Sequence, residues 1–239
     1  MSKILIIGDI HQKIASVRDV LRYEKDTDLT IQLGDVFDDF DDNIYEVEAA
    51  AHWLRESLHN SRRIHLMGNH DIHYMSKSPG SLICSGFASW KHEVISKILT
   101  VKDWNNIRYF YSINNIWLSH AGITRYWFEH PVLGTTTSTI NDKIDAAKVA
   151  LSANDISNTG CINAADHYRG GRHKKGGLLW NDWRNIDFFQ DIMQIVGHTP
   201  SSSVSYKSNN ENNGVCLNVD THMQQSIILD TETKEYKIV

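Results

Sequence analysis

Short apolar runs alternate with amphipathic segments over the first 70 residues of the chain. The runs at residues 3–7, 29–33 and 64–67 are rich in Ile and Leu and have the length of buried strands. Between them, residues 12–24 and 44–59 place apolar side chains on one face of a helix. This alternation of strands and helices predicts a parallel sheet with helices outside it.

Strand-like runs dominate from residue 107 onwards. Residues 107–113 and 116–119 flank Asn114-Asn115, a pair typical of a hairpin turn, and residues 139–152 fit a helix. Four more strands are predicted, at residues 193–196, 215–219, 226–229 and 235–239. The change to mostly antiparallel strands predicts two packed sheets with helices on their outer faces.

Length and composition describe an ordinary globular chain. With 239 residues, 41% hydrophobic and 22% charged, it can form a single domain over residues 1–239, with a loop-rich segment at about 153–177 bordering the site. A net charge of -5 disfavours a nucleic-acid partner. Three isolated cysteines and the lack of a bilayer-length apolar run predict a soluble, cytoplasmic protein without a membrane partner.

Polar clusters follow the apolar runs at the points where strands are expected to end. They are Gly8-Asp9-Ile10-His11, Gly34-Asp35-Val36-Phe37-Asp38, Gly68-Asn69-His70-Asp71 and the single histidines His120 and His198. Carboxylate, imidazole and amide groups bind divalent metals, and the ends of parallel strands are where open sheets place their sites. Taken singly, Asp9 and Asp35 could cap helices and Asn69 could belong to a turn. Together the five strand ends predict a two-metal hydrolytic site.

The order of these motifs resembles that of the calcineurin-like metallophosphoesterases, from about residue 3 to about residue 220. Within that family the chain is most similar to bacterial and bacteriophage members of the phosphoprotein-phosphatase branch. That similarity rests on three runs, His120-Ala121-Gly122, Leu178-Leu179-Trp180-Asn181-Asp182 and Gly197-His198-Thr199-Pro200. The resemblance implies an α/β fold, an αββα sandwich of two mixed β-sheets flanked by helices.

The resemblance also implies two divalent metal ions and their ligands. Asp9, His11 and Asp35 would hold the first ion, and Asp35 would bridge to the second. The ligands that join Asp35 at the second ion would be Asn69, His120 and His198. Pro200 replaces a second histidine that nuclease-like branches have, which leaves the first ion with fewer protein ligands. Mn²⁺ is the favoured ion, with Fe, Zn, Ni, Co and Mg as alternatives.

The implied reaction is attack of a metal-bridging hydroxide on the phosphorus of a phosphomonoester. His70 would protonate the leaving group, and Asp38 would orient its imidazole. The substrate would be a phosphorylated protein, on phosphoserine or phosphothreonine, or a small phosphate ester.

Phosphate binding is where the sequence departs from the resemblance. Asp39 stands where this branch has an arginine that binds the substrate phosphate, and residues 39–42 are predicted to form a solvated acidic loop. Arg169 and then Arg172 are the candidates to replace that arginine, since a guanidinium suits phosphate. A solvated basic loop without such a role is the alternative.

Three other functions stay open. A nucleotide or diadenosine-tetraphosphate hydrolase is the nearest alternative, because such enzymes share the Gly-His-Thr-Pro run. A phosphodiesterase or nuclease fits Pro200 and the acidic balance less well. An inactive scaffold of the same fold is disfavoured, because such proteins usually lose ligands that this chain keeps.

Overall fold

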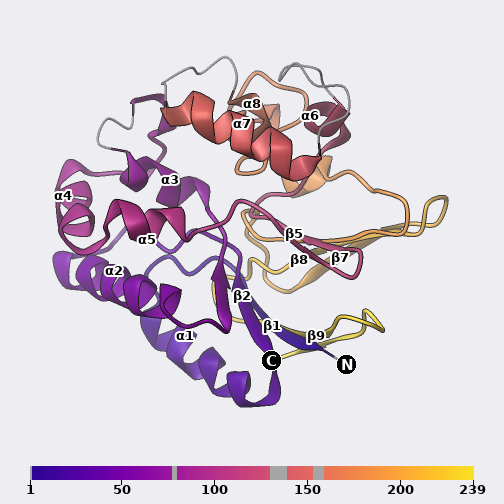
Figure 1. Cartoon of the computed structure of the whole chain (residues 1–239), viewed down its shortest axis with the longest axis horizontal. Helices are drawn as coiled ribbons and strands as arrows, with labels where there is room; N and C mark the ends of the chain where they lie inside the picture. The colour runs from indigo at the N-terminus through magenta and orange to yellow at the C-terminus, as the bar shows by residue number, and fades with distance from the viewer. Residues whose placement is uncertain (1, 77–79, 130–138, 153–158) are drawn as a thin grey trace.

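Two five-stranded sheets form the centre of the computed structural model, which describes residues 2–76, 80–129, 139–152 and 159–239 (Figure 1). The first sheet has the order β10-β9-β1-β2-β3. Its strands are β1 (Lys3–Ile7), β2 (Leu29–Gln32), β3 (Arg63–His65), β9 (Ile227–Asp230) and β10 (Tyr236–Ile238). As predicted, β1, β2 and β3 run parallel, whereas β9 is antiparallel to β1 and β10 is antiparallel to β9.

The second sheet has the order β4-β5-β6-β8-β7. Its strands are β4 (Tyr111–Ile113), β5 (Ile116–Leu118), β6 (Met193–Val196), β7 (Ser205–Asn209) and β8 (Gly214–Asn218). The predicted hairpin is confirmed, since Asn114 and Asn115 both have positive φ and join the antiparallel pair β4 and β5. Most pairings of the strands after residue 107 are antiparallel, as predicted, but β6 at the centre of this sheet lies parallel to both β5 and β8.

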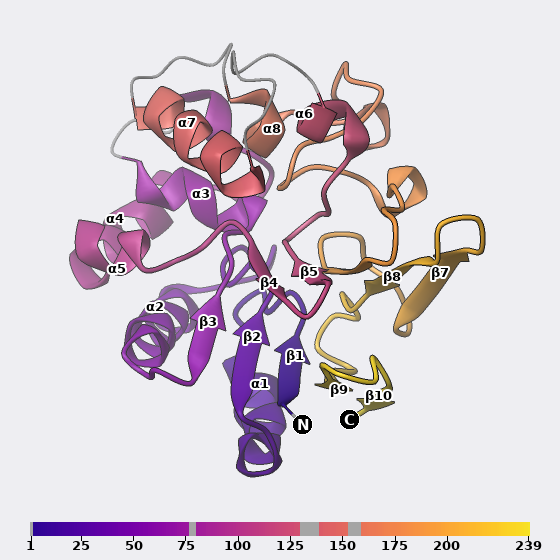
Figure 2. The same cartoon turned by 45° about the vertical axis from the view of Figure 1, so that its right-hand side comes forward.

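Helices lie outside the sheets (Figures 1 and 2). They are α1 (Ile14–Leu21), α2 (Ile44–Leu58), α3 (Asn69–Met75), α4 (Ser89–Ile98), α5 (Val101–Asn105), α6 (Arg125–Glu129), α7 (Ile140–Ser152) and α8 (Gly160–Asn163). Short 3-10 turns add η1 (Arg22–Asp26), η2 (Gly80–Leu82), η5 (His167–Arg169) and η6 (Trp183–Asn185). The described part of the predicted loop at 153–177 therefore holds one short helix and one 3-10 turn. None of the described helices is long and apolar enough to cross a membrane.

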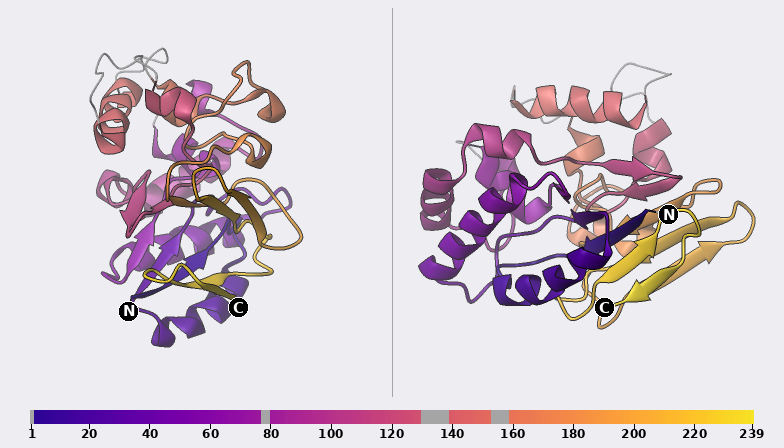
Figure 3. Two further views of the ribbon diagram at one scale, coloured as in Figure 1. Left: turned by 90° about the vertical axis from the view of Figure 1, so that its right-hand side faces the viewer. Right: turned by 60° about the horizontal axis from the view of Figure 1, so that its bottom comes forward.

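An apolar core fills the space between the two sheets. Ile4, Ile6 and Ile31 from the first sheet pack in one cluster with Leu118 and Ile195 from the second. The other face of β1, with Leu5 and Ile7, packs in the cluster that includes buried residues of α1 and α2. Alternate residues of one strand therefore face the opposite sheet and the outer helices. The expected sandwich of two mixed sheets flanked by helices is confirmed, and two turned views display its layers (Figure 3).

Candidate metal centre

The carboxyl ends of five strands bring the six predicted metal ligands into one place. Asp9 and His11 follow β1, Asp35 follows β2, Asn69 follows β3, His120 follows β5 and His198 follows β6. Two groups of side chains have ligand atoms within 4.8 Å of one another, Asp9 with His11 and Asp35, and Asp35 with His120 and His198. Asp35 belongs to both groups, so its carboxylate lies where it can bridge two ions.

Asn69 completes the second group. Its Oδ1 lies 2.8 Å from Nε2 of His120, and the same nitrogen lies 3.3 Å from Oδ2 of Asp35 and 3.1 Å from Nδ1 of His198. Nδ1 of His120 is 2.9 Å from the carbonyl oxygen of Leu33, so it must carry the proton that it donates. In the neutral ring Nε2 then carries a lone pair that faces two oxygen acceptors, from Asn69 and Asp35, and a ring nitrogen of His198. Such a convergence of ligand atoms is suited to a cation.

His11 has the same arrangement. Its Nδ1 donates to the carbonyl oxygen of Phe37 at 2.9 Å, which leaves Nε2 facing Oδ2 of Asp35 at 4.0 Å. A backbone carbonyl that fixes the tautomer and orientation of a histidine in this way is the usual partner of a metal-ligating imidazole.

Buried carboxylates give the site an excess of negative charge. Asp9, Asp35 and Asp220 are all buried, and one oxygen of Asp220, Oδ2, has no hydrogen-bond partner among the described residues. Burial raises the pKa of Asp9 well above its usual range, and the charges of Asp220 and Asp35 raise it further. Since buried charges need compensation, divalent cations fit this donor set. No role for Asp220 was predicted from the sequence, although this residue follows β8 in the same manner as the ligands follow their strands.

The backbone that carries the ligands is held in uncommon conformations. His11, Asp35 and His198 all have left-handed φ values, of 41°, 55° and 67°. Hydrogen bonds hold these turns, since the amides of Ile10 and His11 both donate to the carbonyl oxygen of Asp35 at 2.9 Å. Conformations of this kind persist where the surroundings fix them, as at functional sites.

Asp71 is the main organiser of the turn at Asp35, a role that was not predicted from the sequence. Its carboxylate is buried and accepts from the amides of Asp35, Val36 and Gly68 at 2.8, 2.9 and 3.0 Å. Gly68 allows this close approach, because a Cβ there would collide with the Asp35 carboxylate. The signal for Asp71 was its place as the last residue of Gly68-Asn69-His70-Asp71.

His70 and Asp38 form a pair beside the metal ligands. Nδ1 of His70 lies 3.2 Å from Oδ2 of Asp38. Burial opposes the charged imidazolium, but the Asp35 charge and the Asp38 hydrogen bond outweigh it and raise the pKa of His70 well above its usual value. The other oxygen of Asp38 accepts from Tyr74 and from Lys91, at 2.5 and 3.2 Å. His70 is thus held where it can carry a proton.

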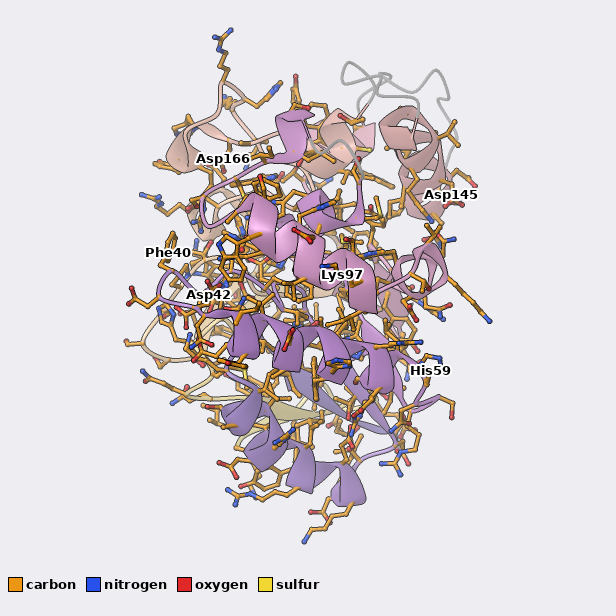
Figure 4. The ribbon with its side chains drawn as sticks, turned by 90° about the vertical axis from the view of Figure 1, so that its left-hand side faces the viewer. Phe40, Asp42, His59, Lys97, Asp145 and Asp166 are labelled. Atoms are coloured by element: carbon orange, nitrogen blue, oxygen red, sulfur yellow. The ribbon has the colours of Figure 1, made fainter. Side chains whose placement is uncertain are left out.

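The acidic run after Asp38 is not wholly solvated, which corrects the prediction for residues 39–42. Asp42 is paired with Lys91 at 2.7 Å, and both side chains are almost completely buried. Asp39 and Phe40 line a cleft that opens beside the predicted metal ligands, and the side chain of Phe40 is 74% exposed. Figure 4 places Phe40, Asp42 and Asp166 on the same side of the molecule. Lys91 thus anchors the loop whose outer part borders the site.

Of the two candidate arginines, one lines the site and the other does not. Arg169 lines the same cleft, which has a volume of about 350 Å³, together with His70, His198 and Trp180. Its guanidinium donates to the carbonyl oxygen of His198 and to Oγ1 of Thr199, at 3.1 and 2.6 Å, and its Nε lies 3.1 Å from Asp182. Arg172 is exposed and is not among the described residues that line the cleft.

Comparisons with known proteins identify the family and agree with the fold. A family model described as calcineurin-like phosphoesterase matches residues 2–222. No curated protein matches the chain in sequence. Among solved structures, a protein described as a candidate diadenosine tetraphosphatase is 14% identical, with a TM-score of 0.53, over 100% of this chain and 93% of its own. A serine/threonine phosphatase from Saccharomyces cerevisiae with similarity to human phosphatase PP5 is 15% identical, with a TM-score of 0.51, over 100% and 79%. A metallophosphoesterase from Sphaerobacter thermophilus is 13% identical, with a TM-score of 0.51, over 99% and 86%. At these identities the likeness concerns the fold.

Proposed function

Because this chain belongs to the calcineurin-like phosphoesterase family, we propose that it is a phosphomonoesterase that depends on two divalent metal ions, with Mn²⁺ as the favoured ion. The observation that carries the proposal is the position of Asp35, shared by two groups of metal ligands, with the His70–Asp38 pair beside them. The favoured substrates are phosphoserine and phosphothreonine in proteins. A cytoplasmic location is proposed with it, from the isolated cysteines.

Two bound ions would supply an activated water and neutralise charge on the phosphate oxygens. The first ion would be held by Asp9, His11 and Asp35. The second would be held by Asp35, Asn69, His120 and His198.

The protein groups have separate tasks. His70 holds a proton at the edge of the cleft and gives it to the leaving oxygen, and Asp38 keeps the ring in place through Nδ1. Arg169 is the residue that we propose binds the substrate phosphate. This role is supported by its position in the lining of the same cleft and by the contacts of its guanidinium with Asp182 and Thr199.

The test is phosphate release from an aryl phosphate monoester by chelator-stripped protein, with and without added Mn²⁺. We expect turnover that needs Mn²⁺ and that is lost in Asp35→Asn. The control is Asp145→Asn on α7, whose side chain is 74% exposed. Turnover of an aryl diester alone would show that the chain is a phosphodiesterase, and Mn²⁺-dependent turnover retained in Asp35→Asn would refute the shared-ligand geometry.

A nucleotide substrate is the second candidate, because two aromatic side chains line the cleft. Phe40 is exposed and Trp180 is half-buried, and either ring could stack on a base. Parallel assays with a phosphoserine peptide and diadenosine tetraphosphate separate the two candidates. Faster turnover of the dinucleotide, lowered by Phe40→Ala, would favour the second.

A further inference from the structure

The end of strand β8 carries a buried carboxylate to which the proposed function gives no task. Asp220 lies two residues beyond β8, is 1% exposed, and has Oδ2 without a hydrogen-bond partner among the described residues. Burying a carboxylate oxygen without a donor is costly, so such an atom in a folded protein requires an explanation. We propose that Asp220 is an outer ligand of the first metal ion, at which Oδ2 accepts a hydrogen bond from a water molecule that the ion holds. This inference rests on the proposed two-metal function.

The register of the second sheet places Asp220 level with a predicted ligand. Strands β6 and β8 are parallel neighbours, and Val196 lies opposite Asn218. The pairing continues beyond the strands, since the amide of Val219 donates to the carbonyl oxygen of Val196 at 2.8 Å. His198 and Asp220 each lie two residues beyond that pair. Both therefore lie at the edge of the sheet where the metal centre forms.

Close packing of the backbone brings Asp220 to the side of the first ion. A Cβ at Gly8 would collide with the carbonyl oxygen of Val219 and would lie 3.2 Å from Cα of Asp220. Gly8 directly precedes Asp9, which belongs to the ligand group of the first ion and not to that of the second. Asp220 therefore approaches the centre next to a ligand that serves the first ion alone.

The spacing of the ligand atoms indicates an outer rather than a direct ligand. Among the described residues, the group with ligand atoms within 4.8 Å of one another contains Asp9, His11 and Asp35 but not Asp220. A water molecule on the ion bridges such a gap and needs an acceptor for its hydrogen. The octahedral coordination that Mn²⁺ favours has positions for water beyond these three side chains, and Pro200 stands where nuclease-like branches have a further histidine.

The turn after β8 holds the carboxylate in place. Oδ1 of Asp220 accepts from the amide of His222 at 3.3 Å, and the carbonyl oxygen of Asp220 accepts from the amide of Ser201 at 3.0 Å. Oδ2 is then the oxygen available to a further donor. His222 lines the cleft, so this turn borders the space that water enters. A third buried carboxylate beside Asp9 and Asp35 also strengthens the attraction for a divalent cation.

Mn²⁺ binding tests this role without any assay of turnover. Electron paramagnetic resonance of the free ion, during titration of chelator-stripped protein, gives the number of bound ions and their dissociation constants. We expect two ions on the unaltered chain. Asp220→Asn keeps the size of the side chain and an acceptor for the His222 amide, and it should raise one dissociation constant about 10–100-fold. The matched control is Asp103→Asn, which changes another buried carboxylate, on α5, and should leave both constants unchanged.

A second substitution identifies the ion that Asp220 serves. His11→Gln weakens binding of the first ion, so adding Asp220→Asn to it should have little further effect on the ion that remains. Asn69→Ala weakens binding of the second ion, and adding Asp220→Asn to it should still raise the dissociation constant of the first. The reverse pattern would overturn the assignment to the first ion.

Urea unfolding of the metal-free proteins separates this role from a structural one. Asp220→Asn removes a buried charge without a donor, so the metal-free variant should unfold at the same or a higher urea concentration than the unaltered protein. Unfolding at a lower concentration would make the weaker binding structural and overturn the inference.

The Mn²⁺ titration also distinguishes failure of this inference from failure of the proposed function. Two ions bound to Asp220→Asn with unchanged constants would overturn the inference alone. A loss of affinity as large as that of Asp9→Asn would also overturn it, because Asp220 would then be a direct ligand. Fewer than two ions on the unaltered chain would refute the proposed two-metal function, and the inference with it.

Discussion

His65 provides a test of burial that is independent of catalysis. It ends β3, is 3% exposed, and packs against Trp53 with the ring centroids 5.4 Å apart. Nε2 lies 2.8 Å from Oγ of Ser57, and Nδ1 has no hydrogen-bond partner among the described residues. Burial, with the nearby charge of Arg63, lowers the pKa of His65 from 6.5 to about 3. The folded protein therefore keeps this imidazole neutral at a pH where the unfolded chain protonates it.

The sign of the pH effect follows from that difference. Between pH 6.5 and pH 3 the unfolded state binds a proton at His65 that the folded state does not bind. Protonation of His65 in the unfolded state therefore leaves the free energy of unfolding unchanged above pH 6.5 and lowers it progressively as the pH falls below that value. At about 1.4 kcal/mol per pH unit, the fall is about 2 kcal/mol from pH 7 to pH 5, and about 5 kcal/mol over the whole window.

The perturbation is His65→Gln, which keeps a polar group near Ser57 and cannot titrate. Urea unfolding of chelator-treated protein, followed by circular dichroism at pH 7, 6 and 5, gives the free energy of unfolding of each form. Other titrating groups are common to both proteins, so the difference between them should change by about 2 kcal/mol from pH 7 to pH 5. The control is His52→Gln, at an exposed position of α2. Its free energy of unfolding should change with pH by the same amount as that of the unaltered protein. If the free energy of unfolding of His65→Gln also changed with pH by the same amount as that of the unaltered protein, the reasoning from burial would be refuted.

Four other changes test the site. His70→Ala should lower kcat by about 10²–10⁴ for alkyl phosphate esters and far less for nitrophenyl phosphate, and equal losses on both would remove the proton-donating role. Arg169→Ala should raise KM with little change in kcat, whereas unchanged kinetics would leave phosphate binding to another group. Lys91→Met should lower the free energy of unfolding by about 3–5 kcal/mol, since it leaves Asp42 without its buried partner and removes one of the donors to Asp38, and a change below about 1 kcal/mol in urea unfolding would contradict this pairing. Mn²⁺ at about 100 times its Kd should raise the free energy of unfolding by about 2.7 kcal/mol per site, an increase that Asp35→Asn should reduce.

The strand ends were the most predictable part of the fold and the site. Each predicted ligand follows an apolar run directly, so locating the run locates the ligand, and parallel strands bring their ends to one edge. The pairing of the second sheet could not be derived in this way. Strands β5 and β6 are neighbours although about 75 residues separate them along the chain, and an apolar run does not specify the direction of a distant partner.

Elements without apolar periodicity were missed. Helix α4 buries Lys91 and Ile95, and the lysine is accommodated through its ion pairs, so the pattern of apolar residues that indicates a helix is weak. Strand β7 is polar and lies at the edge of its sheet, where pairing with β8 defines it. Asp71 was missed for a related reason, because it acts through contacts with the turn at Asp35 that only the folded chain brings together.

The division of the ligands between two sheets ties the chemistry to the alignment of those sheets. Four of the predicted ligands follow strands of the first sheet, and two, His120 and His198, follow strands of the second. An apolar interface such as the one around Ile195 tolerates small sliding, whereas metal–ligand distances hold within about 0.2 Å. Bound ions would therefore fix the position of one sheet relative to the other along their shared interface. Changes of side-chain volume in the distant core would alter metal affinity without touching a ligand, so the sequence constraints of catalysis extend along the whole interface between the sheets.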